Sequence, residues 1–167
     1  MKRSVIIAAA LIVAVASYGF SQTAAGYGAR GALRTEELSL EQMLNYAIQD
    51  EYLARTEYEG IMAEYGEMRP FSNIIRSEER HIEWLVELFD AYDLVLTPDD
   101  SESHVVIPDD LQTAFEIGVQ AEIDNIAMYE RFLTRELPAD VRDVFERLKA
   151  ASENHLRAFE NNLERYQ

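Results

Sequence analysis

A carboxylate and an imidazole stand three residues apart in a strongly apolar helical pattern, at Glu78 and His81. Residues three or four apart share a helix face, so both side chains are predicted to point into one core. The apolar residues on that face are Phe71, Ile74, Ile75, Ile82, Leu85 and Phe89. An ionised carboxylate in a dry core is costly unless a cation, a hydrogen-bond donor or a proton compensates it. The pattern therefore predicts a partner for Glu78 inside the fold.

Three further ionisable residues lie on apolar helical stripes elsewhere in the chain: Glu51, Glu122 and His155. In an antiparallel pair of helices, residues equidistant from the turn lie level with one another. Residue 66, a glycine suited to ending a helix, is the midpoint between Glu51 and His81. The midpoint between Glu122 and His155 falls at the turn that Pro138 indicates. Each pair is therefore predicted to lie at one height in its hairpin.

Four amphipathic helices are needed to position these residues. The first begins at Ser39, which forms a capping-box pattern with Gln42, and ends at Gly66. The second runs from Pro70 to about Asp93. The third begins near Asp109, and the fourth follows Pro138. These patterns predict an all-α up-down bundle of four long helices.

The segment from residue 94 to about 108 has a loop composition and is predicted to be a long crossover. Extended, it can reach about 50 Å, whereas a 20-residue helix is about 30 Å long. The third helix can therefore run parallel to the second. His104 lies in this loop and is interpreted as a solvated surface histidine.

Folding the two predicted hairpins together brings Glu51, Glu78, His81, Glu122 and His155 into one layer of the core. Three carboxylates and two imidazoles form a ligand set for iron or manganese. The two halves also share a weak repeat, Glu-x6-Tyr, which ends at Tyr58 and at Tyr129. The alternative is a metal-free polar core, in which Arg55 pairs with Glu51 and the two tyrosines donate hydrogen bonds.

The pattern resembles the ferritin-like di-iron carboxylate superfamily, in which two helices each give a Glu and two others each give Glu-x-x-His. More narrowly, it resembles the DUF2202 family of ferritin-like proteins of unknown function, and the likeness covers residues 38 to 166. The segments that carry it are Asp50–Arg55, Phe71–Glu78 with His81, and Ser152–Phe159. The resemblance implies a ferritin-like bundle that holds a di-iron site.

One position departs from the superfamily pattern. A complete second Glu-x-x-His would need Glu where the chain has Ser152. Glu153 is a poor substitute, because it lies about 200° around the helix on a polar face. Two arrangements stay open: a lopsided di-metal site that water or Asn125 completes, or a single metal ion.

Composition excludes several classes of site and partner. The chain has no cysteine, which rules out disulfides, iron–sulfur clusters and thiolate zinc sites. A net charge of −16 argues against nucleic acid as a partner and favours metal cations. Residues 1–25 combine a basic start, a short apolar run and small residues, which is typical of a secretory signal peptide.

These features predict an exported protein, periplasmic or extracellular, with no integral membrane segment after signal removal. Residues 26–37, rich in glycine, are predicted to be a flexible linker, and residues 38–167 the ferritin-like domain. Export disfavours a large iron-storage shell but leaves a homo-oligomer open.

Three functions follow from the resemblance and the residues. The first is a di-metal oxidoreductase that reacts with dioxygen or peroxide and, lacking a cysteine-rich donor domain, takes electrons from an external donor. The second is a non-catalytic metal-binding protein of the cell envelope. The third is a metal-free helical interaction module. Metal binding ranks above any stated reaction.

Overall fold

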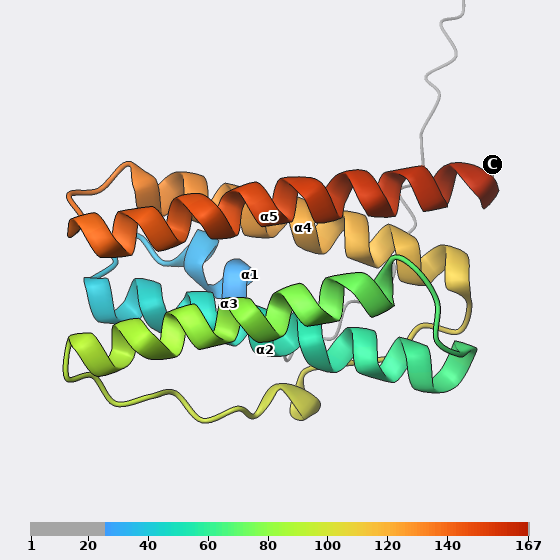
Figure 1. Ribbon diagram of the computed structural model, residues 1–167, viewed down its shortest axis with the longest axis horizontal. Coiled ribbons are helices and arrows are strands. Elements are labelled where there is room, and N and C mark those ends of the chain that lie inside the picture. Colours follow the sequence, from blue (N-terminus) through green and yellow to red (C-terminus); the bar gives the residue numbers. More distant parts are fainter. Residues whose placement is uncertain (1–25, 167) are drawn as a thin grey trace, which may run out of the picture.

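The computed structural model describes residues 26–166 and shows helices without strands in this range (Figure 1). The helices are α1 (Gly28–Arg34), α2 (Leu40–Tyr65), α3 (Phe71–Ala91), α4 (Leu111–Leu133) and α5 (Ala139–Leu163), with short 3-10 turns η2 (Ser101–Ser103) and η3 (Glu164–Tyr166). The predicted all-α bundle of four long helices is confirmed. The predicted signal peptide lies outside the described residues.

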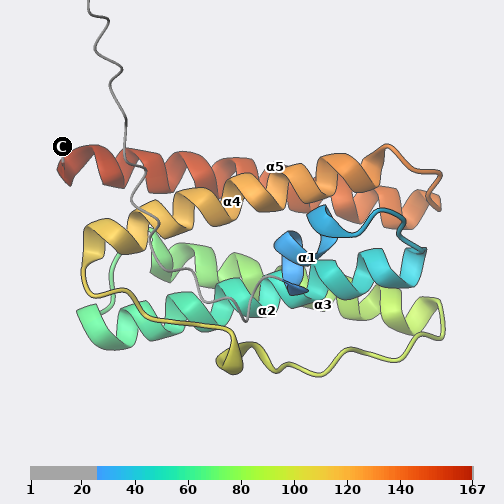
Figure 2. The same ribbon diagram turned by 180° about the vertical axis from the view of Figure 1, so that it is seen from behind.

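Two helical hairpins, α2 with α3 and α4 with α5, form the bundle. The segment between α3 and α4 runs along the bundle from one end to the other, so these two helices point in the same direction (Figures 1 and 2). The long crossover predicted from loop composition is therefore present. None of the helices in residues 26–166 is both long and apolar enough to span a membrane.

The helix ends follow the capping signals in the sequence. The hydroxyl oxygen of Ser39 accepts from the backbone N–H of Gln42 (3.2 Å), and the Gln42 side chain accepts from the backbone N–H of Ser39 (2.9 Å). Gly66 follows α2 with φ +91°, a left-handed conformation that glycine adopts readily. Asp110 caps α4 by accepting from the backbone N–H of Thr113 at 2.8 Å. The predicted start and end of α2 and the predicted start of α4 near Asp109 are therefore confirmed.

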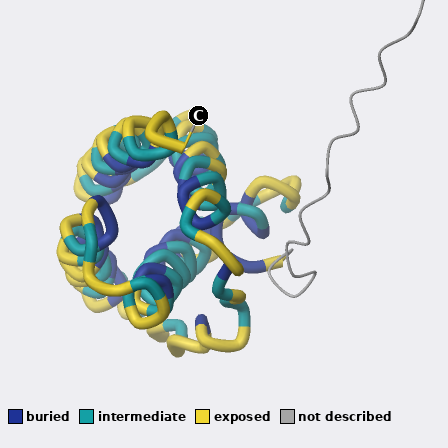
Figure 3. The backbone as a smooth tube through the Cα atoms, turned by 90° about the vertical axis from the view of Figure 1, so that its right-hand side faces the viewer, coloured by how far each residue is buried: buried dark blue, intermediate teal, exposed yellow. Residues whose placement is uncertain are grey.

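The buried stretches of the helices lie on the side of the backbone that faces the bundle interior (Figure 3). The buried apolar residues form two clusters, one toward each end. One cluster includes Leu44, Ile48, Leu85, Phe89, Met128, Phe132, Phe145 and Leu148. The other includes Tyr58, Ile61, Phe71, Ile74, Phe115 and Phe159. In α3, α4 and α5 the ionisable residues predicted as ligands fall between residues of the two clusters, and in α2 Glu51 lies between Ile48 and Tyr58. The polar layer is therefore closed on both sides by packed side chains.

Side-chain contacts hold the crossover against α2. Arg55 forms an ion pair with Asp99, and the hydroxyls of Thr56 and Ser101 lie 2.6 Å apart. The metal-free alternative pairs Arg55 with Glu51, and in the structure Arg55 pairs with Asp99 instead. A position four residues after Glu51 also borders the crossover, whose acidic Asp99 lies in reach without burial of a second charge.

The segment predicted to be a flexible linker instead contains α1, which packs on α2 and α4. A Cβ on Gly28 would lie 2.4 Å from the Asp50 carboxylate, and one on Gly31 would lie 2.6 Å from the Tyr46 ring. The glycines that indicated flexibility are therefore needed for close packing. The Asp50 carboxylate accepts from the backbone N–H of Ala29 at 2.7 Å, which fixes the start of the helix.

His104 also differs from its prediction as a solvated side chain. Its ring stacks on that of Tyr27, with centroids 4.1 Å apart, and its side chain is only 17% exposed. The crossover folds back toward α1 at this point, which the loop composition does not reveal.

We predict that Gly28→Ala lowers the free energy of unfolding by about 2 kcal/mol or more, because Gly28 has φ +53° and no room for a Cβ. Gly26→Ala is the matched control, since nothing lies within 4 Å of a Cβ there, and it should change stability by less than about 0.5 kcal/mol. Denaturant unfolding of both variants measures the difference. Equal stability of the two would mean that α1 does not pack as described.

Candidate metal centre

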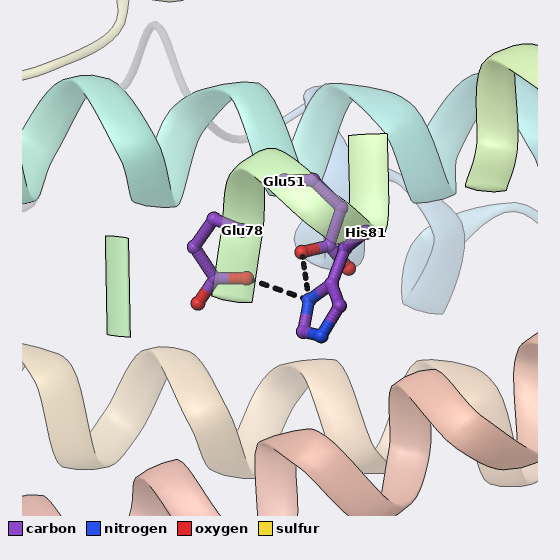
Figure 4. Close-up of side chains that lie close together, drawn as sticks. All are labelled: Glu51, Glu78 and His81. Atoms are coloured by element: carbon purple, nitrogen blue, oxygen red, sulfur yellow. Dashed lines mark hydrogen bonds and ion pairs between the residues drawn. The ribbon is translucent and has the colours of Figure 1, made fainter. Parts of the chain in front are cut away.

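The five predicted ligands come from four different helices and are buried together. Their exposed fractions are Glu51 2%, Glu78 2%, His81 3%, Glu122 4% and His155 8%. Figure 4 shows Glu51, Glu78 and His81, with the two carboxylates turned toward one ring nitrogen. The level placement predicted from the two hairpin midpoints is therefore present in the fold.

Glu78 lies at the centre of the cluster, because each of its two oxygens faces a different histidine. The Nδ1 atom of His81 is 2.7 Å from Glu78 Oε2 and 3.0 Å from Glu51 Oε2. On the other side, the Nδ1 atom of His155 is 3.2 Å from Glu78 Oε1 and 3.4 Å from Glu122 Oε1. The result is two groups of two oxygens and one nitrogen that share Glu78, each with its atoms within 4.8 Å of one another.

Neighbouring hydroxyls orient these side chains. The Tyr129 hydroxyl donates to Glu51 at 2.8 Å, and the Tyr58 hydroxyl donates to Glu122 at 3.2 Å. Ser77 Oγ lies 3.1 Å from Nε2 of His81 and thereby keeps Nδ1 toward the carboxylates. Such outer contacts fix the orientation of metal-binding imidazoles and carboxylates. Each tyrosine thus donates to the glutamate of the other hairpin and not to the glutamate seven residues before it in the sequence.

Ser152 and Asn125 form hydrogen bonds with protein groups other than the five predicted metal ligands. The Ser152 hydroxyl donates to Asn125 Oδ1 at 2.9 Å, and the Asn125 amide donates to Asp50 Oδ2 at 2.5 Å. Both residues nevertheless line a cavity of about 10 Å³ beside Glu51, Glu78 and Glu122. That volume corresponds to about one water molecule. The cavity leaves room for one small further ligand next to the carboxylates.

Burial and mutual contact shift the pKa values of the whole cluster. Burial opposes the charged form of His81, but Glu51 and Glu78 outweigh it and raise the His81 pKa to about 10. The pKa of His155 is likewise raised to about 10, against burial, by Glu122 and Glu78. Burial raises the pKa of Glu51 to about 8 despite the nearby His81. Without metal, protons on both imidazoles therefore neutralise the carboxylates.

Glu78 and Glu122 respond in opposite directions. Burial acts to raise the pKa of Glu78, but hydrogen bonds from His155 and His81 outweigh it and lower that pKa. Burial raises the pKa of Glu122, although His155 works against the shift. Glu78 is therefore the carboxylate that stays ionised between the two imidazolium groups.

Two half-buried carboxylates near the cluster, Asp50 and Glu57, were missed in the sequence. Burial raises the pKa of Asp50 and of Glu57 to about 7. Asp50 meets α1 and Asn125, and Glu57 faces a second cavity. The apolar stripe of α2 indicated that Glu51 points into the core, but it gave no such indication for Asp50 and Glu57. The groups that surround these two residues come from α1 and the crossover, which the stripe does not reveal.

A comparison with models of known protein families identifies the family of this chain. The model of the rubrerythrin family matches residues 42–163, which include all five residues of the cluster. The chain belongs to the rubrerythrin family. This family lies within the ferritin-like di-iron superfamily, as the resemblance in the sequence implied.

A solved structure shares the fold of this rubrerythrin family member. It is the hypothetical protein MJ0754 from Methanococcus jannaschii DSM 2661, with TM-score 0.67 and 24% identity, covering 79% of this chain and 85% of that one. A comparison with curated protein sequences finds no match.

The residues of the cluster fit the metal pair that a rubrerythrin domain suggests. Each of the two groups offers carboxylate oxygen and imidazole nitrogen, the donors that iron accepts. Glu78 presents one oxygen to each group, so it can join two ions. The residues that lie around the groups also supply the orienting hydrogen bonds that metal ligands need.

We predict that ferrous iron binds more tightly as pH rises from 6 to 8. Metal binding requires neutral imidazole, and His81 and His155 with pKa values raised to about 10 carry protons that the metal must displace. The affinity should rise about tenfold per pH unit for each proton displaced. Chelator competition at several pH values, without oxygen, measures this slope. An affinity independent of pH would contradict the assignment of the histidines as ligands.

Proposed function

We propose that this protein is an exported di-iron protein that reacts with dioxygen or peroxide, using electrons from an external donor. The observation that carries the proposal is the pair of buried Glu/His groups that share Glu78. Membership of the rubrerythrin family supports iron over manganese. Within this proposal, the narrower relationship to the DUF2202 family rests on the sequence segments alone.

Glu51, Glu122, Glu78, His81 and His155 would hold the metal pair. A bound iron pair supplies redox chemistry with dioxygen or peroxide. The protein's own part is to fix the ligands through Tyr58, Tyr129 and Ser77, and to exclude bulk water with the apolar clusters on either side. Three carboxylates offset three of the four charges of two ferrous ions. The site therefore favours one further small anionic oxygen ligand, for which the cavity beside Asn125 has room.

Trp84 is a half-buried residue whose ring lies next to that of His81. The two rings are 5.6 Å apart between centroids, and the guanidinium of Arg147 lies 5.7 Å from the Trp84 ring.

The chain has no cysteine for a redox domain of its own. An external donor fits this composition, and the signal-like residues 1–25 support export to the periplasm or outside the cell.

The proposal is tested by iron content after anaerobic loading and desalting of the full chain. We expect about two iron ions per chain in the wild type, and an absorption change when peroxide is added. Glu78→Gln should reduce iron to background, because Glu78 belongs to both groups, whereas His155→Ala should leave about one ion. Elemental analysis gives the stoichiometry.

Glu79→Gln is the matched control, since Glu79 is the exposed neighbour of Glu78 on the same helix and should keep full iron content. Circular dichroism shows whether each variant keeps its helices. Full iron content in a folded Glu78→Gln protein would overturn the site. A folded wild type that takes up no iron would make the cluster a polar network and the protein a metal-free interaction module.

A further inference from the structure

A second and larger space, of about 290 Å³, lies where α1, α2, α4 and the crossover meet. We call it the α1 cavity. Figure 2 shows α1 beside α2 and α4, with the crossover passing on the same side of the bundle. The volume is near the lower limit for small-molecule sites, so the cavity suits a ligand smaller than a drug.

Most of the wall is aliphatic. Leu53 comes from α2, Ile117 from α4, and Val105, Ile107 and Pro108 from the end of the crossover. The crossover is held in place there, because a Cβ on Gly60 would lie 2.3 Å from Ile107 and the Tyr65 hydroxyl donates to the Pro108 carbonyl at 2.5 Å. The wall is therefore fixed, and it would bind an apolar body better than a hydrated ion.

Acidic groups outnumber basic ones in the lining. The carboxylates are Asp50, Glu57, Asp109 and Asp124, against the guanidinium of Arg30. Asp124 pairs with Arg30 at 3.3 Å, and Asp50 accepts hydrogen bonds from Ala29 and Asn125. After these contacts, the lining has an excess of negative charge.

Glu57 is a carboxylate of the lining that takes part in none of these contacts. Within residues 26–166 it has no hydrogen bond or ion pair to another side chain, although Arg30 is near enough to influence it. The Glu57 side chain is surrounded by protein yet remains partly accessible, because it borders the cavity. Burial raises its pKa to about 7, and a cation beside it would favour the charged form. A half-buried carboxylate that accepts no hydrogen bond from residues 26–166 is open to a donor that enters the cavity.

Two buried polar atoms in the lining make no hydrogen bond of good geometry within the described residues. They are the hydroxyl oxygen of Tyr27, whose pKa is raised by burial and by the nearby Asp100, and Nδ1 of His104, which stacks on Tyr27. Buried polar atoms without partners are rare in folded proteins. Their presence here, together with Glu57, distinguishes this cavity from a packing defect lined only by apolar groups.

We infer that the α1 cavity binds a small organic cation, a primary ammonium carried on a short aliphatic body, with the ammonium group on Glu57. The aliphatic walls select against an inorganic cation, which would keep its water. The carboxylate excess selects against organic anions. A primary ammonium offers three donors, enough to reach Glu57 and further acceptors on the lining.

The inference goes beyond the proposed function, because Glu57 and the aliphatic wall lie outside the five metal ligands. The two sites are nevertheless neighbours. Asp50 and Ala121 line both the α1 cavity and the small cavity at the cluster. A ligand in the α1 cavity would therefore lie close to the candidate metal centre, separated from it by these two residues.

The test uses three probes of one chain length: hexylammonium, 1-hexanol and hexanoate. Calorimetric or NMR titration of the full chain, with and without iron and at 150 mM salt, gives the affinities. We expect hexylammonium to bind at least about tenfold more tightly than hexanol, because it adds a charge-assisted hydrogen bond, and hexanoate not to bind. Equal affinity for hexylammonium and hexanol would overturn the inference.

Variants assign the binding to this cavity. Glu57→Gln should weaken hexylammonium about tenfold and leave hexanol unchanged, whereas Glu59→Gln, an exposed residue of the same helix, should change neither. Ile117→Phe should weaken both probes by filling the cavity. Unchanged hexylammonium affinity in a folded Glu57→Gln protein would overturn the inference. A protein that binds iron but not the amine refutes only this site, and one that binds the amine but no iron refutes only the proposed function.

Discussion

The fold depends on one constraint: three carboxylates and two imidazoles occupy a single layer inside the bundle, shut off from solvent at both ends. Isolated buried charges of this kind cost several kcal/mol each, so the groups must compensate one another. Glu78 makes this possible, because its two oxygens face His81 and His155. Protons on the imidazoles contribute this compensation without metal. Metal ions would compete with those protons for the same nitrogen atoms.

Helix register is what keeps this layer together. The ligands come from both hairpins, so a shift of one residue in any helix would turn a carboxylate by about 100° away from the layer. The capping box at Ser39, the Asp110 cap and the turns at Gly66 and Pro138 limit such shifts. Packed aromatic rings on either side, such as Phe71 with Phe159 and Phe132 with Phe145, hold the helices at fixed depth. Precise placement of the polar layer is thus a consequence of apolar packing.

The sequence was sufficient to predict the four long helices, the crossover and the convergence of the five ligands, because helical periodicity and distance from a turn are local properties. It was insufficient wherever a contact depends on which loop lies next to a helix. Arg55 pairs with Asp99 of the crossover instead of Glu51, and nothing within α2 distinguishes these outcomes. Glycine was ambiguous in the same way, since Gly28 and Gly31 provide close contact and not flexibility. The surroundings of Asp50 and Glu57 were hidden because α1 and the crossover supply them.

Asp50 gives this missed helix a role in the site. The superfamily pattern would place a fourth carboxylate at residue 152, where this chain has a serine. That serine donates to Asn125, and Asn125 donates to Asp50, whose other oxygen accepts from the first turn of α1. An acidic group is thus present in this direction, but two hydrogen bonds separate it from Ser152. Asp50 lines both cavities. Ser152 is smaller than a glutamate, so the small cavity beside the metal ligands has space there. The backbone N–H of Ala29 in α1 supplies a hydrogen bond that keeps Asp50 in place. The element that looked least structured in the sequence therefore helps to define how the cluster differs from the four-carboxylate pattern.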